Sequence, residues 1–179
     1  MDVPDSAPDA SDYAIPRFCS QCGSPVLRIE VHGEPAWVCP ECGHRHYRRP
    51  TVGAAVAVVE SDKVLLVRRG FGARAGQWCV PCGHVGWDED VRAAAVREVR
   101  EETGLEVQIE RLLAAHSNLW RRERQTVGVW FVGRRVGGTL TPGDDAVDAR
   151  FFALDDVPEL AFPTDALVLA ELRDEIATR

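Results

Sequence analysis

Three glutamates lie close together near the middle of the chain, at positions that would share one face of a helix. Glu98, Glu101 and Glu102 are spaced i, i+3 and i+4, so their carboxylates would project from the same side. The three negative charges repel one another. Mg²⁺ or Mn²⁺ would relieve this repulsion, because a hard divalent cation prefers oxygen ligands. The alternative is an acidic face that only meets solvent, as most charge runs do.

The residues around the glutamates predict the element that carries them. Asp88 is the expected N-cap, and Ala93–Ala95 are good helix formers. Gly104 stands where a helix C-terminus needs a residue with positive φ. The sequence therefore predicts a loop that leads into a helix of about four turns.

The whole pattern from Gly83 to Leu105 matches a known signature. It reads glycine, five residues, glutamate, seven residues, Arg-Glu, an aliphatic residue, any residue, Glu-Glu, any residue, glycine and an aliphatic residue. This is the Nudix box, so the chain resembles the Nudix hydrolases. The resemblance implies an α/β/α sandwich with a mixed sheet, dependence on a divalent metal, and hydrolysis of a nucleoside diphosphate linked to another group, X.

The resemblance and the chemistry of a pyrophosphate suggest catalytic roles. Glu98 and Glu102 would bind the catalytic metal, and Glu101 would be a third ligand or a base. Arg97 would pair with Glu101 one turn on and orient it. Glu89 would be a further ligand or would help the helix to start.

Two cysteines beside the box allow two interpretations. Cys79 and Cys82 form a CxxC pair, which can be redox active, but the pair adjoins the box glycine and lacks the strand and helix order of thioredoxin-like proteins. We favour structural cysteines, with inhibition by oxidation as the alternative. The family resemblance gives the residue before the box glycine, Cys82, a backbone carbonyl that can reach the metal.

The general base and the substrate contacts are expected outside the box. Candidate bases are Asp144, Asp145 and Asp148, and Asp148 precedes an Ala-Arg-Phe-Phe segment similar to one in family members; a plain turn is the alternative for the first two. Candidate phosphate partners are Arg68 and Arg69, and candidate surfaces for stacking a base are Trp78 and Trp120. The alternative for these four is surface charge and core aromatic residues.

Four cysteines near the N-terminus form two CxxC pairs. Cys19 and Cys22 are separated from Cys39 and Cys42 by 16 residues, a spacing typical of tetrahedral zinc sites. A β-hairpin around His32-Gly33-Glu34 would complete a zinc ribbon. This Zn²⁺ would be structural, because all four ligands are thiolates and none leaves an open position. Two disulfides are the alternative, but cytosolic thiols stay reduced.

Composition and charge limit the class of protein. The 179 residues allow one ordinary domain and a small appendage, and 45% hydrophobic residues can form a core. The sequence has neither a membrane-length apolar run nor a signal peptide, so we expect a cytoplasmic protein. A net charge of −7 argues weakly against general nucleic-acid binding.

Three segments are expected: a disordered acidic lead over 1–16, the zinc ribbon over 17–47 and the Nudix domain over 50–179. Within the last, the apolar pattern predicts strands over 51–60 and 63–69 joined at Ser61-Asp62, a strand within 107–116, a strand over 126–135 with Gly137-Gly138 as its turn, a short strand over 149–154 and an amphipathic helix over 164–177.

A zinc ribbon directly before a Nudix domain is similar to the NADH pyrophosphatase branch. That branch carries a Ser-Gln-Pro-Trp-type segment after the box, where this chain reads His116-Ser-Asn-Leu-Trp120, so ADP-ribose or another ADP-linked compound is at least as well supported as NADH. We expect a small nucleotide substrate, and the chain could also form a homodimer. The alternatives are an RNA 5′-cap (NAD-cap) hydrolase and a non-enzymatic nucleotide sensor or nucleic-acid-binding protein.

Overall fold

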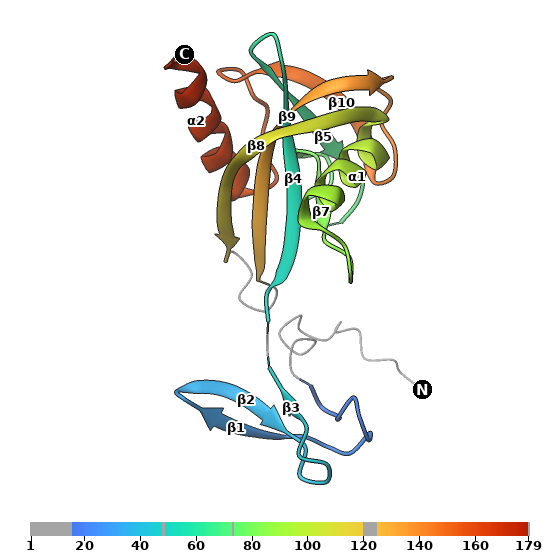
Figure 1. Cartoon of the computed structure of the whole chain (residues 1–179), viewed down its shortest axis with the longest axis vertical. Helices are drawn as coiled ribbons and strands as arrows, with labels where there is room; N and C mark the ends of the chain where they lie inside the picture. Colours follow the sequence, from blue (N-terminus) through green and yellow to red (C-terminus); the bar gives the residue numbers. More distant parts are fainter. Residues whose placement is uncertain (1–15, 48, 73, 120–124, 179) are drawn as a thin grey trace, which may run out of the picture. The chain divides into compact units, whose positions relative to one another are not determined.

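The structure, a computed structural model, describes residues 16–178 apart from residues 48, 73 and 120–124. The chain divides into two compact units. One contains the chain up to Pro50, and the other contains Thr51–Asn118 and Thr126–Arg179 (Figure 1). Among the described residues, no helix combines the length and apolar character that crossing a membrane would require.

The smaller unit is built on a short antiparallel sheet. Its strands are β1 (Leu27–Val31), β2 (Glu34–Val38) and β3 (Arg45–His46), in the order β1-β2-β3. His32 and Gly33 form the β1–β2 turn with φ of 53° and 81°, the backbone that two-residue hairpin loops need. The predicted hairpin is present, but Glu34 belongs to β2 because the turn uses only two residues.

The larger unit contains a mixed sheet and both helices. Its elements are β4 (Thr51–Glu60), β5 (Lys63–Arg69), β6 (Trp78–Cys79), β7 (Cys82–His84), α1 (Val91–Thr103), β8 (Leu105–Asn118), β9 (Thr126–Gly138), β10 (Ala146–Ala153) and α2 (Pro163–Ala177). The strand order is β10-β5-β4-β9-β8, while β6 pairs with β5 and β7 with β4. β4 and β9 run parallel, and the other neighbouring strands run antiparallel.

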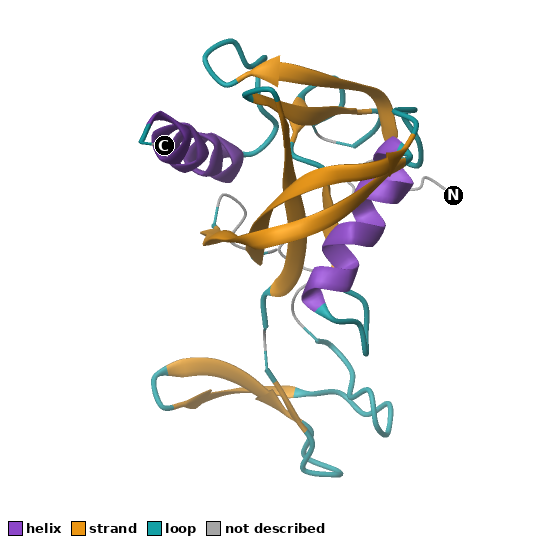
Figure 2. Ribbon diagram, turned by 45° about the horizontal axis from the view of Figure 1, so that its top comes forward, coloured by secondary structure: helices purple, strands orange, loops and turns teal. Residues whose placement is uncertain are grey.

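Alternate residues of β4 face two different cores. Val56 packs in one buried cluster with Val99 of α1. Ala57, the next residue, packs in a second cluster with Leu172 of α2. Because successive strand side chains point to opposite faces, each helix covers one face of the sheet (Figure 2). This arrangement confirms the predicted α/β/α sandwich.

Several predicted boundaries are wrong. Gly137 and Gly138 lie within β9 and do not form its turn, because the ladder with β8 continues to the pair Leu105↔Gly138. The same ladder makes β8 longer than the strand predicted within 107–116. The predicted amphipathic helix is present as α2, which begins one residue earlier than predicted. Its Leu167 is 53% exposed, so this residue lies off the face that packs on the sheet.

Candidate functional site

The glutamate cluster lies on α1, which begins later than predicted. Asp90 is the N-cap, since its carboxylate accepts hydrogen bonds from the backbone N–H groups of Arg92 (2.9 Å) and Ala93 (3.2 Å). Asp88, the predicted N-cap, has a φ of 60°, whereas an N-cap residue needs an extended backbone. Gly104 ends the helix with a φ of 67°, as predicted.

Two of the three glutamates point into the protein. Glu98 and Glu102 are only 9% and 2% exposed, while Glu101 is exposed. A Cβ atom on residue 83 would overlap with the Glu98 carboxylate, so only glycine allows this approach. The backbone N–H of Cys82 donates to Oε2 of Glu102 at 2.9 Å. The backbone of β7 therefore lies directly against both buried carboxylates.

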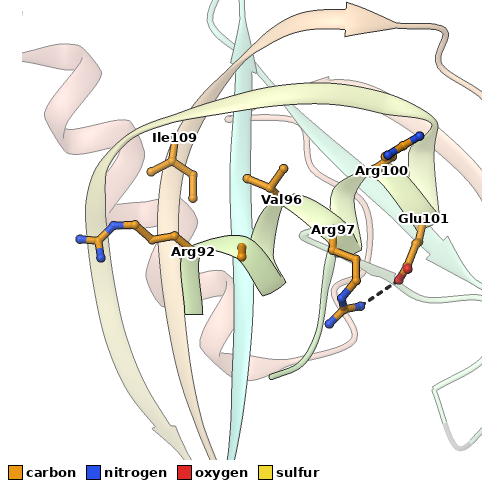
Figure 3. Close-up of a pocket in the computed structure, with 7 residues that line it drawn as sticks. Arg92, Val96, Arg97, Arg100, Glu101 and Ile109 are labelled. Carbon is orange, nitrogen blue, oxygen red and sulfur yellow. Dashed lines mark hydrogen bonds and ion pairs between the residues drawn. The ribbon is translucent and has the colours of Figure 1, made fainter. Parts of the chain in front are cut away.

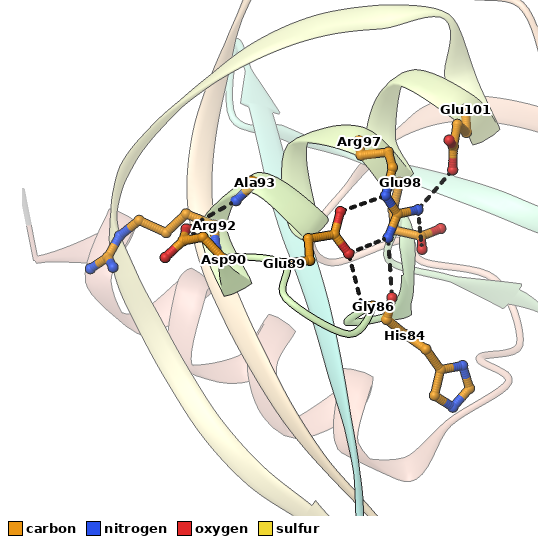
Figure 4. Close-up of polar contacts among 9 residues, drawn as sticks. All are labelled: His84, Gly86, Glu89, Asp90, Arg92, Ala93, Arg97, Glu98 and Glu101. Carbon is orange, nitrogen blue, oxygen red and sulfur yellow. Dashed lines mark hydrogen bonds and ion pairs between the residues drawn. The ribbon is translucent and has the colours of Figure 1, made fainter.

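Arg97 connects the carboxylates around α1 (Figure 4). Its Nε and Nη2 atoms donate to the two oxygens of Glu89 at 2.7 and 2.9 Å. Its Nη1 atom donates to Glu98 at 2.7 Å and to Glu101 at 2.9 Å. Nη2 also donates to the backbone carbonyl of His84 at 3.1 Å. The predicted Arg97–Glu101 pair is present, and the same guanidinium also fixes Glu89 and the loop before the helix.

Burial strongly changes the electrostatics of this cluster. Desolvation raises the pKa of Glu102 to about 10, with a further contribution from Cys79. Desolvation also raises the pKa of Glu98, although Arg97 opposes the shift. Glu89 behaves oppositely, because its hydrogen bonds from Arg97 lower its pKa to about 2. A cation among the two buried glutamates would offset the cost of keeping them ionised.

The loop before β10 brings two more carboxylates to the cluster. The backbone N–H of Gly143 donates to the carbonyl of Glu102 at 3.0 Å, which ties the loop to the end of α1. The charge of Asp144 raises the pKa of Glu98, and the charge of Asp145 raises that of Glu102. Both aspartates therefore act on the buried glutamates.

Asp148 is held by arginines instead. Its Oδ2 atom lies 2.7 Å from Arg150 and 3.7 Å from Arg68. Both guanidinium groups also lie over the ring of Trp78, at 5.9 and 6.0 Å from its centroid, and Phe152 packs edge-on against that ring. Trp78 is thus covered by side chains. Trp120, the other predicted stacking surface, lies outside the described residues.

Arg69 contacts two groups that act electrostatically on Glu102, namely Asp145 and Cys79. It pairs with Asp145 at 3.7 Å and hydrogen-bonds with Cys79. Cys79 is buried and Cys82 is partly exposed, and both are free thiols. Their thiols contact each other, and this contact, together with burial, raises the pKa of Cys82.

Asp165 is a buried acid that the sequence analysis missed. It is 1% exposed in the first turn of α2, and its Oδ2 atom accepts a hydrogen bond from the backbone N–H of Val80 at 3.2 Å. Burial raises its pKa to about 7. The only signal was an acidic residue at a helix start, where acids are common and usually exposed.

The four N-terminal cysteines form one cluster in the smaller unit. Their Sγ atoms all lie within 4.8 Å of one another. The pairs Cys19–Cys42 and Cys22–Cys42 are 3.6 Å apart, and Cys22–Cys39 is 3.4 Å apart. A tetrahedron with Zn–S bonds of about 2.3 Å has edges of about 3.8 Å. The thiols therefore fit a zinc ribbon without rearrangement.

Comparison with known proteins agrees with this geometry. A family model, the NUDIX domain, matches residues 48–172. An ADP-ribose pyrophosphatase of Methanocaldococcus jannaschii is 34% identical over 131 residues, covering 73% of this chain and 78% of that protein. A NUDIX hydrolase structure from Nitrosomonas europaea superposes with a TM-score of 0.79 at 28% identity, covering 91% of this chain and 92% of that one.

A second group of relatives is longer. The NAD-capped RNA hydrolase NudC of Stutzerimonas stutzeri is 34% identical over 145 residues, which is 80% of this chain and 50% of that protein. The chain thus spans about half the length of these relatives.

Proposed function

The chain belongs to the NUDIX domain family of hydrolases, and we propose that it hydrolyses the pyrophosphate bond of an ADP-linked nucleotide. The observation that carries this proposal is the pair of buried carboxylates, Glu98 and Glu102, packed against the backbone of β7 at Gly83. Burial of two acids costs stability unless a ligand compensates.

We assign the catalytic metal, Mg²⁺ or Mn²⁺, to Glu98, Glu101 and Glu102 with the backbone carbonyl of Cys82. Oxygen donors of this kind suit hard divalent cations that keep water and phosphate oxygens as further ligands. When bound, the cation supplies charge neutralisation at the pyrophosphate and a more acidic water.

The protein's own residues hold this constellation in place. Arg97 restrains the Glu98 and Glu101 carboxylates through one guanidinium group, so their oxygens are positioned before substrate arrives. The bidentate pair with Glu89 in turn fixes Arg97. Preorganisation of this kind lowers the cost of reaching the transition state.

The candidate general bases are acids near the glutamate cluster. Glu101 is exposed and can accept a proton if it is not a ligand. Asp144 and Asp145 act on the buried glutamates, which supports them over Asp148. Arginines also pair with two of these acids, Arg69 with Asp145 and Arg68 and Arg150 with Asp148. Arg69, beside Asp145, is a stronger candidate than Arg68 for contacting a substrate phosphate.

ADP-ribose is the substrate that we favour, with NADH next. The relative named ADP-ribose pyrophosphatase is matched over 78% of its length, whereas the NudC relatives are matched over 50%. The NudC similarity supports hydrolysis of NAD-capped RNA as an alternative function.

We further propose that Cys19, Cys22, Cys39 and Cys42 bind one structural Zn²⁺. This site requires reduced cysteines, and the cytoplasm, where we expect the protein to function, keeps cysteines reduced.

One screen tests the proposed activity. The purified chain is incubated with ADP-ribose, NADH, FAD, dinucleoside polyphosphates, nucleoside triphosphates and NAD-capped RNA, with and without Mg²⁺ or Mn²⁺, and products are identified by mass. We expect metal-dependent release of AMP from ADP-ribose. Full activity in excess chelator, or no activity on any ADP-linked compound, contradicts the proposal.

A further inference from the structure

A groove of about 820 Å³ lies between the outer face of α1 and β8 (Figure 3). Its floor is aliphatic and consists of Ala93 and Val96 on α1 and Ile109 on β8. The volume and the largely apolar lining are in the range of small-molecule sites, which also carry a few polar groups that orient the ligand.

Arginines provide those polar groups. Arg92 and Arg100 line the groove and are exposed. Neither has an ion-pair partner within the part of the chain that the structure describes, and Arg92 only lies over the ring of Phe131 at 5.5 Å. The third arginine, Arg97, is already committed to Glu89, Glu98 and Glu101.

The two uncommitted guanidinium groups flank the floor. Arg92 and Arg100 are two turns apart on α1, so their Cα atoms are about 12 Å apart along the axis. In Figure 3 their side chains extend from opposite ends of the helix segment, with Val96 between them. A ligand that fits this arrangement needs an apolar body for the floor and an anionic group that reaches one end.

We propose that the groove between α1 and β8, which adjoins the metal centre at Arg97 and Glu101, binds a phosphorylated nucleoside without metal. The base and ribose lie over Ala93, Val96 and Ile109, and the phosphate receives hydrogen bonds from Arg92 or Arg100. Guanidinium groups bind phosphate oxygens through paired hydrogen bonds. A longer polyanion fits less well, because the chain carries a net charge of −7 and Glu101 also lines the groove.

Binding is measured by calorimetry. AMP is titrated into the zinc-loaded full chain in buffer without Mg²⁺ or Mn²⁺. This measurement needs no turnover, so it is independent of the proposed hydrolysis. We expect saturable binding of AMP, and binding at least about tenfold weaker for adenosine or inorganic phosphate alone, since each keeps only one of the two contacts.

Two variants locate the site. Arg92→Gln with Arg100→Gln should weaken AMP binding by about tenfold or more. The matched control, Arg134→Gln with Arg173→Gln, removes the same charge at exposed positions outside the groove and should change affinity less than about twofold.

The second variant, Ala93→Glu, places a carboxylate on the exposed floor of the groove. Residue 93 is three positions after the Asp90 N-cap, where glutamate favours the helix. Thermal stability should therefore be kept while AMP binding is lost. The proposal is overturned if wild type shows no saturable AMP binding, if either groove variant binds as wild type does, if the control loses as much as the groove variant, or if a single-stranded oligonucleotide binds in preference to AMP.

Discussion

At the scale of single residues, Gly83 packs closely against the Glu98 carboxylate. A methyl group at position 83 would occupy the space of the Glu98 carboxylate. Position 83 therefore requires glycine because a side chain would not fit. The backbone conformation does not require glycine here, since the φ of Gly83 is not positive.

Gly83→Ala should lower kcat of the ADP-ribose reaction by about 100-fold, because a shift of about 1 Å in a catalytic group costs that much. The matched control is Gly53→Ala on β4, where the new Cβ would lie 3.4 Å from the Thr126 side chain and should cost little activity. Steady-state kinetics with circular dichroism checks both. Equal activity of the two variants would show that the Glu98 position does not matter.

Glu102→Gln keeps the side-chain shape and an oxygen for the Cys82 N–H. Burial raises the pKa of Glu102 to about 10, so the metal-free protein should be equally or more stable after this change. Turnover should fall by about 100-fold or more, as when one charge contact to a transition state is lost. Stabilisation of the protein by Mg²⁺ in thermal melts should shrink in parallel. Unfolding of the variant, or near-normal turnover, would make Glu102 a structural residue.

At the scale of elements, α2 is fastened to the site through its first turn. Asp165 accepts the Val80 N–H between Cys79 and Cys82, so the helix start holds the segment that leads into β7. The anchor is a carboxylate in a nearly dry environment, and this makes its strength depend on pH.

Asp165→Asn tests this dependence. The folded-state pKa of Asp165 is about 7 against an ordinary value of 3.8, so the folded protein binds more protons between those values and loses stability as pH rises through that window. The variant keeps an acceptor oxygen but no charge. It should gain up to about 4 kcal/mol over wild type at pH 8 and little at pH 4. Urea unfolding at both pH values measures the difference; the same difference at both would refute the assignment.

The sequence predicted elements whose determinants are local. The helix over the glutamates followed from its alanine-rich stretch and Gly104, and the ribbon followed from cysteine spacing. The errors come from contacts between distant segments. Gly137 and Gly138 join β9 because β8 lies beside them, and Asp165 is buried because Val80 needs an acceptor. Asp88 was mistaken for the N-cap because composition does not reveal its φ of 60°.

At the scale of the whole molecule, the two compact units have different sources of stability. The smaller unit buries few large side chains beyond Trp37 among its described residues, so it needs a metal or cross-link to stay folded. The larger unit has two apolar clusters, one on each face of its sheet.

Cys39→Ser should therefore remove about one Zn²⁺ per chain and unfold the smaller unit alone. Metal analysis and near-ultraviolet circular dichroism follow the ribbon, while thermal melting of the larger unit should shift by less than about 2 °C. Glu41→Gln, an exposed neighbour between Cys39 and Cys42, is the matched control and should retain zinc. Unchanged zinc content in Cys39→Ser would reject the ribbon assignment.

The parallel pairing of β4 with β9 also governs when the larger unit can form during synthesis. Thr51 and Thr126, the first partners, are 75 positions apart. Until the ribosome has released the chain beyond residue 133, β4 has an open apolar edge, and such edges invite pairing with other chains. All four cysteines of the smaller unit have left the ribosome long before that point. A nascent chain would then carry a finished ribbon ahead of an unfinished sheet, and closing that sheet requires two strands that are far apart in the sequence to pair in a late step.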